Sequence, residues 1–269
     1  MDLELTGQVA VIIGGAKGIG HAIATAFATE RADVVILDID PQVQDSARLL
    51  VQQHDTKALA VICDVTDYAA VQKAASRVVD EFGRCDHIVF AAGIGSGKYG
   101  FPFWNLEPGE WKRVIEVNLI GAVNVAHAFA PTMTAARRGS MLFISSVAGQ
   151  IGSQTDPPYS AAKAGVINFA QCAAKDLAPY NVRVNTICPG MVKTELNKSV
   201  WRAWHDQQSD ANRLSYEDWA EQKIRSVAPL GRWQDVTDIA ALAVFLASPR
   251  ARNITGQTMN VDGGQVMHW

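Results

Sequence analysis

The sequence has few of the residues that build disulfide frameworks or metal centres. Among its 269 residues are four cysteines, Cys63, Cys85, Cys172 and Cys188, and no two of them have the Cys-x-x-Cys spacing. All four lie in apolar segments, which predicts reduced thiols in the core. We therefore expect neither a disulfide nor a metal site.

Clusters of one charge and long apolar runs are also missing. The formal net charge is −3 and basic residues cluster no further than doublets such as Arg137-Arg138, so nothing favours nucleic acid as a partner. The longest apolar runs are far shorter than the ~20 residues of a membrane span. The first residues, from Met1 to Glu4, have neither the basic nor the apolar region of a secretory signal. We expect a cytoplasmic protein with no membrane partner.

What the sequence does contain is a regular alternation of short apolar runs with helical stretches. Continuous apolar strands separated by helices predict a parallel sheet that is covered on both faces. No repeat, linker or low-complexity segment interrupts the pattern, which predicts one doubly wound α/β domain over residues 1–269. The expected strands are residues 9–13, 34–37, 58–62, 87–91, 140–145, 182–187 and 259–261. The expected helices are residues 18–30, 41–53, 68–82, 110–133 and 159–177.

A glycine-rich loop follows the first expected strand. Gly14, Gly18 and Gly20 stand between a buried run and a helix, the context of a dinucleotide-binding fingerprint. Glycines there let the backbone approach a pyrophosphate, which the helix N-terminus attracts. Asp38 closes the next strand, where a carboxylate accepts hydrogen bonds from the adenosine ribose hydroxyls. The alternative for Asp38 is a helix-capping role.

Tyr159 and Lys163 are four residues apart in an expected helix, which places both side chains on one face. A phenol has an ordinary pKa of about 10, and a nearby ammonium favours the phenolate. Ser146 ends an apolar strand thirteen residues earlier, and its hydroxyl is suited to hold the oxygen of a reacting carbon. An isolated Tyr-x-x-x-Lys more often covers surface, but here the glycine loop stands upstream.

Together these residues resemble the short-chain dehydrogenase/reductase family over essentially the whole chain. The matching residues are Gly14, Gly18, Gly20, Asp64, Gly93, Asn118, Ser146, Tyr159, Lys163, Pro189, Gly190 and Thr194. The resemblance implies that Tyr159 is the general acid/base and that Ser146 orients the substrate oxygen. It implies that Lys163 binds the nicotinamide ribose and activates Tyr159, and that Asn118 holds a water in a proton relay to Lys163. The alternative for Asn118 is a helix-interior residue that bonds backbone.

The resemblance also implies where the cofactor lies. Asp64 and Val65 should flank the adenine, and Val192 and Thr194 should meet the carboxamide and a phosphate. The expected cofactor contacts are Gly14, Lys17, Gly18, Ile19, Gly20, Asp38, Asp64, Val65, Ala92, Gly93, Tyr159, Lys163, Pro189, Gly190, Val192 and Thr194.

Two positions depart from the family pattern. Ile13 stands where the family has Thr before the first glycine, and Phe90-Ala91 stands where it has Asn-Asn. Polar groups are missing on both sides, and losing both partners of a hydrogen bond is nearly neutral whereas losing one is costly. We expect an apolar contact in place of a polar one, with cofactor binding retained.

Two residues disagree about which dinucleotide binds. Lys17 resembles the basic residue by which NADP-using relatives meet the 2′-phosphate, and Asp38 resembles the acid that NAD-using relatives place on the ribose. A charge-assisted hydrogen bond contributes roughly 1.5–3 kcal/mol, and an exposed ion pair about 0–1 kcal/mol. Asp38 should prevail, so we expect NAD as the cofactor.

Substrate specificity is expected from two irregular stretches, a loop at residues 93–104 and a lid at about 194–227. The lid is rich in tryptophan, whose rings suit the C–H faces of sugars, although any single tryptophan more often anchors the lid or a subunit interface. The expected substrate contacts are Ser146, Gln150, Gln154, Tyr159 and Trp201. Lys98 and Arg202 are alternatives that would meet an anionic group.

These features predict an NAD-dependent oxidoreductase of a secondary alcohol, most consistent with a sugar, polyol or related hydroxylated small molecule. The alternatives are a reductase of ketoacyl or other carbonyl compounds, and a non-catalytic dinucleotide sensor. Helices 110–133 and 159–177 are apolar on more than one face, which predicts a homotetramer. The tail from Gln265 to Trp269 is expected to pack on a neighbouring subunit.

Overall fold

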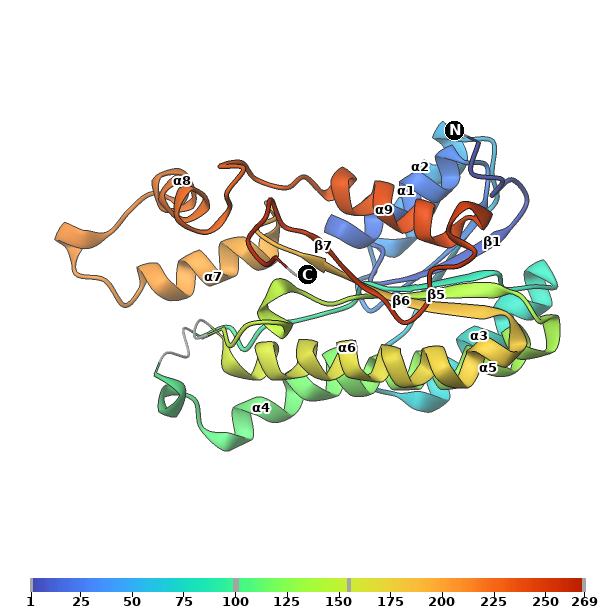
Figure 1. Cartoon of the computed structure of the whole chain (residues 1–269), viewed down its shortest axis with the longest axis horizontal. Helices are drawn as coiled ribbons and strands as arrows, with labels where there is room; N and C mark the ends of the chain where they lie inside the picture. The colour runs from blue at the N-terminus through green and yellow to red at the C-terminus, as the bar shows by residue number, and fades with distance from the viewer. Residues whose placement is uncertain (1, 99–101, 154–155, 268–269) are drawn as a thin grey trace.

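The structure is a computed structural model, which describes residues 2–98, 102–153 and 156–267. Over these residues seven parallel strands form one sheet in the order β3-β2-β1-β4-β5-β6-β7 (Figure 1). The strands are β1 Val9–Ile13, β2 Asp33–Asp38, β3 Ala58–Ile62, β4 His87–Phe90, β5 Gly139–Ile144, β6 Val182–Pro189 and β7 Thr258–Val261. The predicted doubly wound parallel sheet is confirmed, with each strand within two residues of its predicted bounds.

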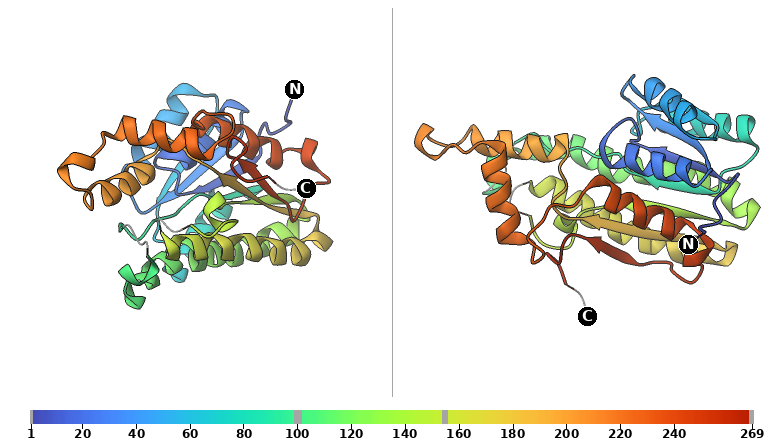
Figure 2. Two further views of the ribbon diagram at one scale, coloured as in Figure 1. Left: turned by 60° about the vertical axis from the view of Figure 1, so that its left-hand side comes forward. Right: turned by 90° about the horizontal axis from the view of Figure 1, so that it is seen from above.

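Helices cover both faces of this sheet (Figures 1 and 2). One face carries α1 Gly18–Thr29, α2 Val43–Gln53 and α9 Val236–Ala247. The other carries α3 Tyr68–Phe82, α4 Pro108–Ile115, α5 Gly121–Ala136 and α6 Pro157–Leu177. Two clusters of buried apolar side chains fill the space between the sheet and these two layers. Burial on both faces explains why the central strands are continuously apolar.

The departures from the family pattern lie where β1 and β4 pair. Ile13 and Phe90 are partners in the parallel register, and both are almost completely buried in one apolar cluster. The backbone N–H of Ala91 donates to the Ile13 carbonyl at 2.8 Å. The backbone ladder therefore ties the two strand ends together, and apolar packing stands in for the missing polar pair, as the sequence predicts.

The helix predicted at residues 110–133 is longer than expected and interrupted. It begins at Pro108 behind a capping box formed by Glu107 and Glu110, and it opens into a π-helical turn at Glu116–Ile120 before α5. A π-turn inserts one extra residue per turn and often marks a functional position. Asn118 lies in this turn and is completely buried.

By length and composition, the helical segment Pro108–Ala136 could cross a membrane. In the fold it packs on the sheet through Val125, Phe129 and Met133, which are buried. A core helix passes the same test, so the expectation of no membrane partner stays a prediction.

Three of the four cysteines are buried as predicted, but Cys172 is exposed on α6 and is not a core thiol. The sequence prediction was wrong there because α6 is apolar on several faces, so its outward side could not be identified. Among the described residues, no group of three His, Cys, Asp or Glu side chains is placed to hold a metal ion.

The predicted lid is helical and consists of α7 Glu195–His205 and α8 Tyr216–Val227. In Figures 1 and 2 it extends beyond the carboxyl ends of the strands. Aromatic contacts join the two helices: the Trp204 and Trp219 rings are 6.3 Å apart, and Trp201 lies 5.8 Å from Tyr216. The lid is thus a packed unit rather than an irregular loop.

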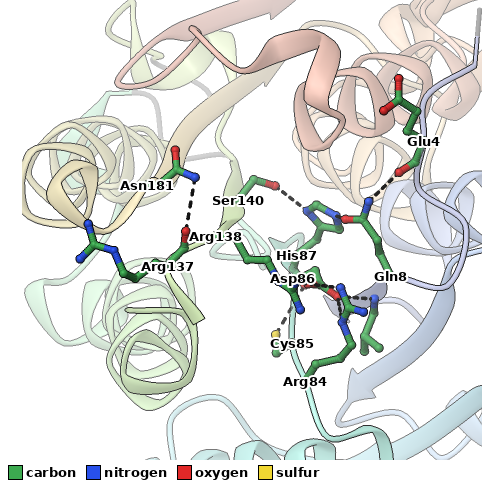
Figure 3. A network of polar contacts seen from close by, with 11 residues as sticks. Glu4, Gln8, Arg84, Cys85, Asp86, His87, Arg137, Arg138, Ser140 and Asn181 are labelled. Atoms are coloured by element: carbon green, nitrogen blue, oxygen red, sulfur yellow. Dashed lines mark hydrogen bonds and ion pairs between the residues drawn. The ribbon is translucent and has the colours of Figure 1, made fainter. Parts of the chain in front are cut away.

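A buried polar network lies at the opposite edge, where β1, β4 and β5 begin (Figure 3). Asp86 accepts a hydrogen bond from the Val9 backbone N–H at 2.9 Å and forms ion pairs with Arg84 and Arg138. The His87 ring bonds Ser140 at 2.9 Å and Gln8 at 2.8 Å. The network fixes the amino ends of the central strands, far from the edge where α/β sheets bind ligands.

Candidate active site

A cavity of about 330 Å³ lies at the carboxyl edge of the sheet, beneath the lid. Its catalytic side is lined by Ser146, Tyr159 and Lys163, and its lid side by Leu196, Val200, Trp219, Lys223 and Val227. The predicted cofactor residues Ile19, Gly93, Pro189, Gly190, Val192 and Thr194 also line it. Residues predicted from three distant stretches of sequence are therefore brought to one cavity.

The glycine loop has the close approaches that its composition predicts. Gly14 has a φ of +81°, and a Cβ atom there would lie 2.6 Å from the Ala92 backbone nitrogen. A Cβ at Gly20 would lie 2.1 Å from the Gly14 carbonyl oxygen. Gly18 has a φ of +60° with open space around it. The loop forms a tight backbone cradle at the start of α1, which fits a pyrophosphate.

Two carboxylates stand at the adenosine end of this cradle. Asp38 accepts hydrogen bonds from the backbone N–H groups of Ala16 at 2.9 Å and Asp40 at 3.0 Å. The Lys17 ammonium lies 3.2 Å from the Asp40 carboxylate. The backbone bond of Gln42, followed by the bond from Lys17, lowers the pKa of Asp40. Lys17 therefore already has an ion-pair partner, Asp40, which the sequence analysis did not predict.

The residues expected near the adenine are close to Asp38 but outside the cavity. Asp64 follows β3, the neighbour of β2, and its carboxylate accepts bonds from both the backbone and the hydroxyl of Thr66. Val65 is buried, and a Cβ at Gly121 would lie 2.7 Å from it. Asp64 and Asp38 thus share one end of the sheet, whereas Val65 packs partly on α5.

Tyr159 and Lys163 project from one face of α6, as their spacing predicts. The Lys163 ammonium lies 5.5 Å from the centre of the Tyr159 ring and donates to the Ile144 carbonyl at 2.8 Å. A Cβ at Gly93 would lie 2.8 Å from the Asn118 side-chain oxygen and 3.2 Å from the Lys163 nitrogen. Only glycine leaves Asn118 and Lys163 this close together across the backbone.

The side-chain nitrogen of Asn118 is used in hydrogen bonds to described residues, but its side-chain oxygen is not. Its amide nitrogen donates to the carbonyls of Ile94 at 2.8 Å and Val114 at 2.9 Å. Its buried side-chain oxygen has no partner among the described residues. A buried acceptor left open is costly, so this oxygen fits the expected water between Asn118 and Lys163.

Burial changes the proton affinities of the catalytic pair. Removal from water raises the pKa of Tyr159 above its ordinary value, opposed by hydrogen bonding with Ser146 and reinforced by the charge of Asp156. Removal from water lowers the pKa of Lys163 to about 8. Desolvation thus opposes the phenolate that the sequence analysis expects the Lys163 ammonium to favour.

Asp156 is a residue of the site that the sequence analysis missed. It caps α6, and its carboxylate accepts the Ser96 backbone N–H at 2.7 Å and the Tyr159 backbone N–H at 3.4 Å. Burial raises the pKa of Asp156, and the two backbone bonds oppose that rise. The signal was present as an Asp before Pro157-Pro158, which is an N-cap followed by proline at the first helical turn.

The predicted substrate residues are distributed differently. Ser146 and Tyr159 line the cavity, but the Gln150 amide pairs with Asn260 at 2.8 and 2.9 Å. The Trp201 indole donates to the Leu214 carbonyl at 3.2 Å within the lid, and Trp219 lines the cavity in its place. Gln154 lies outside the described residues.

The two cations suggested for an anionic substrate are both engaged elsewhere. Lys98 forms an ion pair with Glu110, and Arg202 lies 3.5 Å from Glu195. Neither lines the cavity, and the structure gives no support to either as a substrate contact.

The family model described as enoyl-(acyl carrier protein) reductase matches residues 14–266. The chain belongs to the short-chain dehydrogenase/reductase family. It is 33% identical over 265 residues to the 3-oxoacyl-[acyl-carrier-protein] reductase of Thermotoga maritima, covering 98% of this chain and 100% of that protein. It is 33% identical over 263 residues to the D-threitol dehydrogenase of Mycolicibacterium smegmatis, covering 98% of this chain and 94% of that protein.

The fold is similar to a solved structure over the whole chain. The L-sorbose reductase of Gluconobacter frateurii, in complex with NADPH and L-sorbose, superposes with a TM-score of 0.90 at 28% identity, covering 100% of both chains. As a short-chain dehydrogenase/reductase, this protein is an enzyme of an oxidoreductase family, and the cavity beneath its lid is the candidate active site.

Proposed function

We propose that this protein is an NAD-dependent oxidoreductase that interconverts a secondary alcohol and a ketone, with a sugar, polyol or related hydroxylated compound as substrate. The observation that carries the proposal is the approach of Asn118 and Lys163 at Gly93, with the Tyr159 ring beside Lys163 and Ser146 in the same cavity. A dinucleotide sensor needs the cradle but not this catalytic set. The sensor alternative is therefore disfavoured.

Each residue has a defined chemical task in alcohol oxidation. Ser146 donates to the substrate oxygen, and Tyr159 accepts the hydroxyl proton as the carbon loses its hydride. Lys163 and Asn118 provide the route by which the proton leaves, through the water that fits the open Asn118 oxygen. When bound, oxidised nicotinamide accepts the hydride, and its positive charge favours the phenolate that burial disfavours.

NAD is the dinucleotide that the adenosine end supports best. The added phosphate of NADP would meet Asp38 and Asp40, and Lys17 is already paired with Asp40. The NADPH in the sorbose reductase structure belongs to that protein, so the choice here rests on these residues. The negative charges of the phosphate and these carboxylates would repel each other, and the repulsion is stronger where burial reduces screening by water.

The polar side chains of the cavity support a hydroxylated small molecule as the substrate. Polar groups from Ser146, Ser153, Asp156 and Gln265 line the cavity together with apolar lid side chains. Among its relatives, a polyol dehydrogenase and a sugar reductase support this class, and the oxoacyl reductase supports the alternative. Reduction of a ketoacyl compound is therefore the second candidate.

The test is an assay of alditols, aldoses, aldonates and 3-hydroxyacyl thioesters with NAD or NADP. Turnover is measured as reduction of the dinucleotide. We expect turnover of a polyhydroxylated compound with NAD. Turnover confined to 3-hydroxyacyl thioesters would establish the second candidate, and tight NAD binding without turnover of any class would favour a sensor.

A further inference from the structure

One basic side chain of the lid differs from all the others. Four of the lid's lysines and arginines are paired with carboxylates within the lid: Lys198 and Arg202 with Glu195, Arg213 with Asp210, and Arg225 with Glu221. Lys223 on α8 has no carboxylate of a described residue within ion-pair distance, and it lines the cavity. An unpaired cation therefore faces the site, whereas the paired ones face solvent.

The surroundings of Lys223 make its charge costly. Its ammonium lies 5.9 Å from the centre of the Trp219 ring, which is buried, and its side chain is half-buried. Removal from water lowers the pKa of Lys223. An ammonium in such surroundings gains more from a bound anion than an exposed one does, because less water screens the pair.

The other charges of the cavity determine where an anion can lie. Asp156 is negative and close to Tyr159, so the catalytic end repels anions. Lys163 at that end is held by the Ile144 carbonyl and approaches Tyr159. Lys223 is on the lid, so a substrate anion is attracted there and its hydroxyl group is directed to Tyr159. This charge arrangement orients a molecule that carries both groups.

We propose that Lys223 binds a carboxylate of the substrate, so that the preferred substrate is a hydroxy acid whose carboxylate lies under the lid while its secondary hydroxyl meets Tyr159 and Ser146. The proposal deepens the proposed function and rests on it. One ammonium balances the single charge of a carboxylate better than the higher charge of a phosphate monoester. The cofactor pyrophosphate is the other anion of the site, and the experiment separates the two.

The experiment compares aldonates of four to six carbons with the alditols of the same chain length and configuration, which replace the carboxylate by a hydroxymethyl group. For the best pair, we expect kcat/KM of the wild type to favour the aldonate by about tenfold or more. Lys223→Met keeps the apolar stem over Trp219 and removes the charge. It should raise the aldonate KM about tenfold, with the KM of the alditol and of NAD changed by less than about twofold. Lys98→Met, which removes an ammonium paired outside the cavity, is the matched control.

A binding measurement tests the proposal without turnover. The same aldonates are titrated into the complex of the enzyme with NADH, and the fluorescence of NADH is followed in the wild type, Lys223→Met and Lys98→Met. We expect only Lys223→Met to weaken aldonate binding, by about tenfold, and we expect added salt to reduce the difference.

Three results would overturn the proposal: equal aldonate binding by the wild type and Lys223→Met, a wild type that prefers the alditols, or a weaker affinity for NADH in Lys223→Met with aldonate binding intact. The last would assign Lys223 to the cofactor pyrophosphate. Aldonate binding that depends on Lys223 in an enzyme that oxidises no alcohol would support this site and refute the proposed function.

Discussion

The carboxylate of Asp156 caps the helix that carries Tyr159, accepting that residue's backbone N–H at 3.4 Å, and it also holds the Ser96 N–H at 2.7 Å. One buried side chain therefore connects the loop after β4 to the first turn of α6. Desolvation is the main cause of the raised pKa of Tyr159, and the negative charge of Asp156 adds to it. A residue placed to fix the catalytic helix thus also influences the pH at which the catalytic base works.

The first prediction concerns Asp156→Asn. Because the Asp156 charge raises the pKa of Tyr159, its removal lowers that pKa, and the rise of alcohol oxidation with pH should move to lower pH. The measurement is the pH dependence of kcat/KM. Asp67→Asn removes the charge from a similar cap on α3, away from the cavity, and is the control. If kcat/KM rises at the same pH as in the wild type, or at a higher pH, the electrostatic role of Asp156 is contradicted.

The second prediction concerns the cofactor. Asp38→Ala should narrow the preference for NAD, which we expect to be roughly tenfold or more in kcat/KM. Asp40→Ala should narrow it too, because it frees the Lys17 ammonium that now lies 3.2 Å from Asp40. Adding Lys17→Ala to Asp40→Ala should then weaken NADP and leave NAD nearly unchanged. A wild type that prefers NADP would show that the two carboxylates do not decide the choice.

The third prediction is that Tyr159→Phe folds and binds NAD but turns over no substrate. The aromatic ring is part of the cavity wall and remains, whereas the hydroxyl group that accepts the proton is lost. Thermal unfolding and NADH fluorescence report the fold and the cofactor, and NADH formation reports turnover. Near-normal turnover in this variant would remove Tyr159 from the catalytic role.

The sheet could be predicted from the sequence because its strands are buried on both faces and its loops have distinctive chemistry. Val9–Ile13 is apolar at every position, and the glycines after it allow the close approach of Gly14 to Ala92. Tyr159 and Lys163 could be paired from spacing alone, since they lie on one helix. These are local properties of the chain.

The rest of the site depends on contacts between distant residues, which spacing does not reveal. The sequence showed a tryptophan-rich lid but not that Trp201 bonds within it while Trp219 faces the cavity. The partner of Lys98 is Glu110, on another element. Lys223 can be recognised as the lid cation without a carboxylate partner among the described residues only when all such pairs are known.

The fourth prediction is a homotetramer. Ile120, the last residue of the π-helical turn before α5, is 45% exposed on the helical layer that also carries α6. Ile120→Asp should weaken the assembly, whereas Val51→Asp on the exposed side of α2 should not. Sedimentation velocity measures both. A wild type that sediments as a monomer at micromolar concentration would contradict the prediction. The role expected for the tail in this assembly involves residues 268–269, which lie outside the described residues.

The last prediction concerns stability and the network at the amino ends of the strands. His87 is buried between Ser140 and Gln8, with its ring stacked on Phe27. Removal from water lowers its pKa to about 4, a shift that Asp86 opposes and that Arg183 and Arg84 reinforce.

Because the pKa of His87 is lower in the folded protein than in the unfolded chain, acid destabilises the fold. Between pH 6.5 and about 4, the unfolded chain protonates this histidine and the folded protein does not, so stability falls as the pH falls. From pH 7 to pH 5 the loss from this group should be about 2 kcal/mol. His87→Gln keeps a hydrogen-bonding side chain without a titrating group, so its free energy of unfolding should fall less over the same range. Urea unfolding at both pH values measures it, with His54→Gln at the end of α2 as the control. Equal losses in the wild type and His87→Gln would mean that His87 accepts its proton in the folded state.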